Sequence, residues 1–233
     1  MKLLDILFEK QSKQNPIFFD RNFPYGKGCS ERFIEIPWAL SKYAGEKRVL
    51  EIGCSFAEDE YIDKLKMLQI PLLYGIDISE KNAKDFIKKT ADIRESGFPS
   101  GYFEMILCIS TIEHVGMDNK KHYSPIHELT NAEHISPDVH AIREMWRILK
   151  KGGKLIVTVP FGKYHDYGWF KHYDATALTN LTESVVYSRL IKEFFIYTPE
   201  GWMSCAEADL ANILYNDNGA IAATGLCCCL FVK

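Results

Sequence analysis

The sequence predicts an α/β fold with a mostly parallel sheet that is covered by helices on both faces. From about residue 48 onward, short apolar runs typical of strands alternate with segments whose apolar residues have helical spacing. One run, residues 103–110, is apolar on both faces, as a central parallel strand requires. The loops between these segments are short, which favours strands joined by crossover helices.

The expected strands are the runs 48–53, 71–79, 91–94, 103–110, 154–160, 194–198 and 226–232. The expected helices lie between them. One follows the first strand and carries an apolar stripe formed by Tyr61, Ile62, Leu65 and Leu68. A short helix covers 175–183, and another begins after Ser204, which has capping-box spacing to Glu207.

The clearest helical pattern lies between residues 136 and 149. Ser136 is a suitable cap, Pro137 suits the first turn, and Asp138 complements the helix dipole. The apolar stripe is formed by Val139, Ile142, Trp146 and Leu149. The segment "KKGG" (150–153) ends the helix with two cations and a glycine.

Composition sets the class of protein and its surroundings. The chain has 233 residues, 47% hydrophobic and 25% charged, and a formal net charge of −3, which argues against a broad nucleic-acid-binding surface. No apolar run approaches the roughly 18 residues of a membrane span, and charges interrupt the first residues, so no signal peptide is expected. The seven cysteines include no CxxC pair, which indicates buried thiols in the cytoplasm.

Sheets of this kind bind ligands at the carboxyl ends of their strands, near the topological switch point. The first such end is "RVLEIGCSFAEDE" (48–60). Gly53 lets the chain leave the strand sharply, and Cys54 and Ser55 continue the turn toward a ligand. Ser55 and Ala57 are small residues where a glycine-rich loop has glycines. The acids at 58–60 disfavour a diphosphate and tolerate a ligand with a positive end.

Three acids follow three successive strands. Glu51 can accept from an ammonium group, and Asp77, followed by Ile78, can hold both hydroxyls of a ribose. Asp92 can accept from an adenine amine, with Ile93 offering a main-chain contact. An acid at a strand end is often only a loop residue, so their joint placement carries the prediction. A molecule with an amino acid at one end and adenosine at the other is S-adenosylmethionine (SAM).

Five segments in this order resemble the class I SAM-dependent methyltransferases, of the Methyltransferase-11 type. They are "VLEIGCSFA", "LYGIDIS", "ADIR", "FEMILCISTIEHVG" and "MWRILKKGGKLIVTVP", within residues 48 to 162. The resemblance implies a Rossmann-like, seven-stranded sheet with an antiparallel C-terminal strand, SAM as cofactor, and Ser110 at the cofactor. It also implies a SAM-binding domain at 48–233 after an N-terminal helical or lid segment at 1–47. Ser55 and Ala57 depart from the family's glycines.

The chemistry of methyl transfer needs the acceptor held in line with the methyl group and, for an oxygen nucleophile, a base. His114 follows the fourth strand and is the candidate base, with Glu113 orienting it or contacting the acceptor. The alternative is that His114 only packs against the cofactor or is an ordinary loop residue.

The acceptor side is expected in insertions near 115–137 and 161–175. The second holds Tyr164, His165 and Trp169, which suit stacking on a sugar or aromatic ring, or else pin the loop to the sheet. Arg32 is expected as a wall residue of the same opening, whereas Trp38 fits the core better. The segments "EIPW" and "FGKYHDYGWF" resemble, more loosely, bacterial members linked to polysaccharide biosynthesis, which favours a glycan acceptor.

Five histidines fall between residues 114 and 140, but none has metal-site spacing, so no metal is expected. The polar run 117–138 is interpreted as a lid. The predicted function is methylation of a hydroxyl on a small-molecule or glycan acceptor, with no nucleic acid partner and no prediction of oligomeric state. Three alternatives are a catalytically silent SAM-fold protein, an NAD-dependent oxidoreductase, which would need G-x-G-x-x-G at 53–58, and an aminopropyl transferase.

Overall fold

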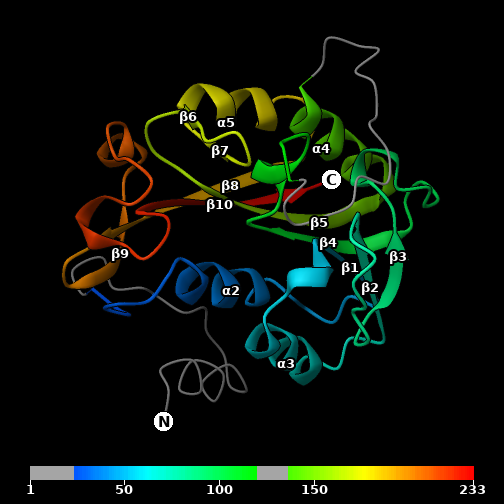
Figure 1. The fold of residues 1–233 in the computed structure, drawn as a ribbon. Helices are drawn as coiled ribbons and strands as arrows, with labels where there is room; N and C mark the ends of the chain where they lie inside the picture. Colours follow the sequence, from blue (N-terminus) through cyan, green and yellow to red (C-terminus); the bar gives the residue numbers. More distant parts are fainter. Residues whose placement is uncertain (1–23, 120–135) are drawn as a thin grey trace.

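The computed structural model describes residues 24–119 and 136–233 (Figure 1). Its centre is an 8-stranded sheet in the order β3-β2-β1-β4-β5-β10-β8-β9. These strands are β1 (Arg48–Ile52), β2 (Leu72–Asp77), β3 (Ile87–Thr90), β4 (Phe103–Ile109), β5 (Leu149–Pro160), β8 (Arg189–Thr198), β9 (Gly201–Cys205) and β10 (Gly225–Val232). A separate hairpin pairs β6 (His165–Asp166) with β7 (Lys171–His172).

Strands β1 to β5 run parallel to one another. Strand β10 is antiparallel to both of its neighbours, β5 and β8. The predicted mostly parallel sheet with an antiparallel C-terminal strand is confirmed, with eight strands in place of seven. From β1 the chain first builds outward through β2 and β3 and then returns to β4 on the other side of β1. The switch point therefore lies between β1 and β4, where a ligand site is expected.

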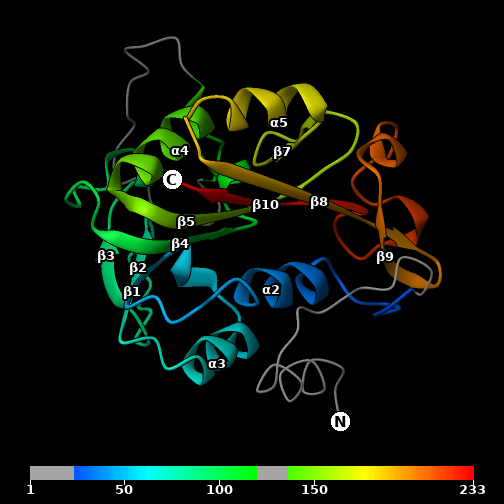
Figure 2. The ribbon, with the colours of Figure 1, turned by 180° about the vertical axis from the view of Figure 1, so that it is seen from behind.

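Helices cover both faces of the sheet. One face carries α2 (Arg32–Leu40) and α3 (Asp59–Met67), and the other carries α4 (Pro137–Ile148) and α5 (Ala175–Thr182) (Figures 1 and 2). The three consecutive cysteines of β10 pack on both faces of the sheet. Cys228 lies in the core under α2 and α3, and Cys227 and Cys229 lie in the core under α4 and α5. This alternation is the period-2 geometry of a strand, and it confirms these thiols as core residues.

Two predicted elements are wrong. The third strand is 87–90 rather than the predicted 91–94. Residues 93–95 form a 3₁₀ turn that Asp92 caps by accepting from the Arg94 amide at 2.8 Å. Ser204 lies in β9, which pairs with β8 across a tight turn, so no helix begins there. The residues after β9 form only a 3₁₀ turn, Glu207–Leu210.

The ends of α4 also differ from the prediction. The helix stops at Ile148, and the "KKGG" segment lies inside β5, where Gly152 has a φ of 76° beside an irregularity in the pairing with β4. Ser136 occupies the cap position, but its hydroxyl bonds to Asp138 rather than to a helix amide. The strong turn signal of the glycines thus marks a strand bulge.

The described part of the N-terminal segment, residues 24–47, shares the core of the main domain. Its helix α2 buries Ile34 and Trp38 on the sheet, as expected for Trp38. The proposed lid at 117–138, including His122, His127 and His134, falls largely on residues outside the described ranges. Within those ranges, no helix is long and apolar enough to cross a membrane.

Candidate functional site

The loop after β1 approaches the loop after β4. Gly53 has a φ of 87°, and a Cβ there would lie 2.8 Å from the Thr111 hydroxyl oxygen, so a glycine is required for this approach. The following turn, Cys54–Phe56, directs Cys54 into the core against Gly75 of β2. Burial raises the pKa of the Cys54 thiol to about 12. Cys54 can therefore serve a ligand only through its main chain.

Asp77 joins the loops that follow β1 and β2. Its carboxylate accepts from the Ser55 amide at 2.9 Å and from the Ser79 amide at 2.8 Å. The Ser55 hydroxyl adds a bond to the Lys81 carbonyl at 3.2 Å, which explains how a serine replaces a loop glycine here. A carboxylate has about four acceptor sites, so Asp77 retains capacity for the two hydroxyls of a ribose.

The residues expected at an adenine ring have partners within the protein. Asp92 is forked with the Arg94 guanidinium, with a shortest distance of 2.7 Å, so an adenine amine would share this carboxylate with Arg94. Ile93 is buried in the core, and Ile78 is half-buried after β2. The contacts predicted for these residues remain predictions.

Glu51 is buried in β1 and accepts from the Tyr61 hydroxyl at 2.6 Å. Burial raises the pKa of Glu51 to about 8, because the charged form is separated from water. At neutral pH the group is therefore largely protonated. Its predicted contact with an ammonium group remains a prediction, and the geometry shows Tyr61 as its partner.

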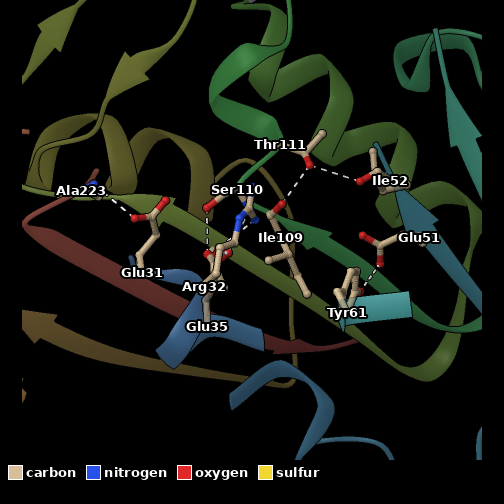
Figure 3. A network of polar contacts seen from close by, with 11 residues as sticks. Glu31, Arg32, Glu35, Glu51, Ile52, Tyr61, Ile109, Ser110, Thr111 and Ala223 are labelled. Atoms are coloured by element: carbon tan, nitrogen blue, oxygen red, sulfur yellow. Dashed lines mark hydrogen bonds and ion pairs between the residues drawn. The ribbon is translucent and has the colours of Figure 1, made fainter. Parts of the chain in front are cut away.

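A polar network links α2 to the ends of β4 and β5 (Figure 3). Glu35 is fully buried, and its carboxylate accepts from the Ser110 hydroxyl at 2.7 Å and the Thr158 hydroxyl at 2.6 Å. Its other oxygen pairs with the Arg32 guanidinium at 2.7 Å. Ser110 has a φ of 40°, a conformation rare outside glycine, so the end of β4 is held in a strained turn.

Arg32 and Ser110 were predicted site residues, and the structure brings them together through Glu35. Sequence reasoning missed Glu31, Glu35 and Thr158. The available signal was "SERFIE", in which Glu31 and Glu35 have the i, i+4 spacing that places them on one helix face. Only the packing of α2 on the sheet shows that this face meets the strand ends.

The predicted catalytic pair lies in the turn Ile112–His114 after β4. The His114 ring places Nδ1 at 2.9 Å from the Trp169 carbonyl oxygen, which can only accept. Nδ1 is therefore the donor in this contact, and Nε2 carries the lone pair in the neutral ring. Oε2 of Glu113 is buried without a hydrogen-bond partner among the described residues, and the contact that orients the His114 ring through Nδ1 is with the Trp169 main chain.

The aromatic loop after β5 has two parts. Phe170 and Tyr173 are buried and fix the loop to the sheet, and Tyr167 stacks on Phe170 with ring centroids 4.6 Å apart. Tyr164 and Trp169 are 47% and 45% exposed, which leaves their rings able to meet an acceptor. His165 is also exposed, in β6. Trp169 lies beside His114, with ring centroids 5.1 Å apart.

No group of three or more His, Cys, Asp or Glu side chains in residues 24–119 and 136–233 is arranged to hold a metal ion.

Comparisons with known proteins agree with this geometry. Residues 50–157 match the family model described as a methyltransferase domain. A SAM-dependent methyltransferase from Thermotoga maritima is similar, with a TM-score of 0.54 and 14% identity over 86% of this chain and 89% of that one. A second SAM-dependent methyltransferase, from Archaeoglobus fulgidus, has a TM-score of 0.53 and 17% identity over 87% of this chain and 91% of that one. No curated protein matches the chain by sequence.

The N-methyltransferase NodS from Bradyrhizobium japonicum, solved with S-adenosyl-L-homocysteine (SAH), gives a TM-score of 0.50 and 15% identity over 98% of this chain and 97% of that one. These findings define the fold. The chain has the fold of the SAM-dependent methyltransferases, and its residues 50–157 match the model of a methyltransferase domain. SAM is the cofactor of this class.

Proposed function

We propose that this protein binds SAM and transfers its methyl group to a hydroxyl of a small-molecule or glycan acceptor. The observation that supports this most strongly is Asp77. It lies at the end of β2, joins the loops after β1 and β2, and keeps acceptor capacity beyond its two amide partners. The placement suits the two hydroxyls of a ribose at the switch point of the sheet.

The described residues fit the cofactor along the strand ends. Gly53, Cys54 and Ser55 bring main chain close to the ligand, and Ser110 lies across from them at the end of β4. Glu51 is proposed to meet the methionine end, and Ile78, Asp92 and Ile93 are proposed to meet the adenine end. When bound, SAM supplies a methyl group already activated by its sulfonium, so the protein has mainly to align the acceptor and exclude water.

His114 is proposed as the general base. With Nδ1 donating to the Trp169 carbonyl, Nε2 takes the proton of the acceptor hydroxyl as the oxygen attacks. This contact fixes both the tautomer and the direction of the ring. Glu113 is proposed to contact the acceptor.

The acceptor is proposed to lie against the exposed rings of Tyr164 and Trp169, near His165, with Arg32 on the facing wall. Exposed aromatic rings beside a base suit stacking on a sugar ring. This supports a glycan acceptor, and we further propose a place in polysaccharide biosynthesis in the cytoplasm. We assign catalysis to residues 48–233 and a supporting role to the segment before them.

Calorimetric titration with SAM and SAH, followed by transfer of a labelled methyl group to a panel of sugars and phenols, tests the proposal. Binding of both ligands with transfer to a hydroxyl is the expected result. Binding without transfer to any acceptor would favour the catalytically silent alternative. Tight binding of NADH with no affinity for SAM would favour an oxidoreductase.

A further inference from the structure

The region between α2 and the ends of β4 and β5 holds more acidic than basic side chains. Arg32 and Glu35 pair at 2.7 Å and neutralise each other. Glu31 and Glu113 are two further acids whose charges act on Arg32, and both are buried. The Glu31 carboxylate accepts a hydrogen bond of 3.2 Å from the Ala223 amide (Figure 3). The charge of Arg32 acts on Glu31 and Glu113 as well, so three carboxyl groups share this guanidinium, which is already paired with Glu35.

The buried Glu113 side chain gives an independent indication that a ligand group binds beside Glu31 and Arg32. Its side chain is 3% exposed, and its Oε2 has no hydrogen-bond partner within residues 24–119 and 136–233. Buried carboxyl oxygens without partners are rare, because the hydrogen bonds that they lose to water are not replaced. Glu113 faces the same charges as Glu31, since Glu35, Arg32 and Glu31 all act on its titration.

The position of these acids separates them from Asp77 and Asp92, the proposed contacts of the adenosine end. Asp77 and Asp92 follow β2 and β3 on one side of β1, whereas Glu113 follows β4 on the other side and Glu31 bonds to Ala223, just before β10. His114, the proposed base, is adjacent to Glu113 in the same turn. A group bound by these acids is therefore on the acceptor side.

We infer that the acceptor carries a positively charged nitrogen, and that Glu113 and Glu31 bind this group. The inference rests on the proposed function, because it names the chemistry of the same acceptor. An ammonium group donates three hydrogen bonds and has no lone pair, so it anchors the acceptor while a separate hydroxyl faces His114. An amino sugar or an amino alcohol has this combination of groups.

The protonation of the two acids agrees with this assignment. Burial, and next the charge of Glu35, raises the pKa of Glu31 to about 7. Burial together with the charges of Glu35 and Glu31 raises the pKa of Glu113 well above its ordinary value. A bound cation favours the ionised form of both, so binding releases protons near neutral pH. The other titratable groups that face them are Arg32, Glu35, Cys108, Tyr173 and Tyr215.

The test compares 2-phenylethylamine with 2-phenylethanol, which differ only in the ammonium and hydroxyl groups. Each is titrated by calorimetry into the full chain saturated with SAH, in two buffers of different ionisation heat. We expect the amine to bind about tenfold more tightly and to release protons, because charge-assisted hydrogen bonds are the stronger kind. Glu113→Gln and Glu31→Gln keep the shape of the site and should abolish the preference and the proton release.

Glu183→Gln is the matched control, since Glu183 is exposed at the end of α5. It should leave the preference for the amine intact. Equal affinity for the two probes, no binding of either, or an unchanged preference in Glu113→Gln would each overturn the inference. Affinity for SAH is measured first in every variant. Failure of the wild-type protein to bind SAH would instead remove the proposed function itself.

Discussion

At the scale of single residues, the acids at the strand ends differ in what they already hold. Asp77 joins two loops and can still accept further hydrogen bonds. Asp92 forms a bidentate ion pair with Arg94, and Glu51 accepts a hydrogen bond from Tyr61. The sequence placed all three at the sheet edge, because strand ends are readable from apolar runs. It did not predict Arg94 or Tyr61 as partners, because side-chain pairing depends on the packed structure.

Asp77→Ala should weaken SAH binding by roughly 1–3 kcal/mol, the range for leaving buried donors unpaired. It should also lower the free energy of unfolding without ligand, because the Ser55 and Ser79 amides lose their acceptor. Calorimetry and denaturant unfolding measure the two effects. Asp63→Ala is the control, since the Asp63 side chain is 74% exposed. Unchanged SAH affinity in Asp77→Ala would exclude Asp77 from the binding site.

Glu51 should make the free energy of unfolding depend on pH. Its pKa is about 8 in the folded protein and near 4.5 when exposed, so between these values the folded state binds more protons than the unfolded state. Protonated Glu51 therefore contributes fully to the free energy of unfolding below about pH 4.5, and this contribution is lost as the pH rises toward 8.

Denaturant unfolding at several pH values between 5 and 8 measures this loss, which is at most about 1.4 kcal/mol per pH unit. Glu51→Gln has no carboxyl group to titrate, so its unfolding free energy should fall less with pH than that of the wild type. Parallel curves for the two proteins would show that Glu51 is ionised in the folded state.

His114→Ala should lower kcat by about 100-fold on a hydroxyl acceptor, in the range for loss of a general base. SAH affinity should be preserved, because the ring contacts Trp169 rather than the cofactor residues. His140→Ala, on the exposed side of α4, is the control. Turnover equal to wild type across the pH range would reduce His114 to a packing residue.

At the scale of elements, helices and strands with a strong apolar periodicity were predicted correctly. Elements predicted from single cap or turn residues were not. The predictions of α3, α4 and α5 and of most strands are confirmed, because each has a clear apolar stripe or run. Strand β3 is "IKKT", half exposed at the sheet edge, so it lacks the apolar run that marks a strand. The capping-box spacing of Ser204 and Glu207 predicted a helix, but Ser204 lies in β9 because this segment pairs with β8.

Helix α2 is the element that completes the site, and Glu35 attaches it to the sheet. Glu35→Ala should lower the free energy of unfolding by about 1 to 3 kcal/mol, because it leaves the buried Thr158 hydroxyl and the half-buried Ser110 hydroxyl and Arg32 guanidinium without their acceptor. Denaturant unfolding measures this loss. Glu193→Ala is the control, because its ion pair with Lys42 spans 3.7 Å at the surface and should contribute under about 1 kcal/mol. Similar small losses in both variants would contradict the role of Glu35.

At the scale of the whole molecule, the fold determines where the chemistry occurs. The reversal of strand order between β1 and β4 gathers loops from distant parts of the sequence at one edge. The alternation of strands and helices was enough to predict this edge. The acceptor side was less predictable, because it combines α2, the turn after β4 and the aromatic loop, three segments that only tertiary packing brings together.

The central claim is that the loops after β1, β2 and β4 hold an adenosyl cofactor. A crystal structure of the full chain grown with saturating SAH tests it most directly. The claim predicts SAH across the Gly53 turn, with both ribose hydroxyls within hydrogen-bonding distance of the Asp77 carboxylate. An empty switch point at saturating ligand, or SAH bound elsewhere on the protein, would contradict it.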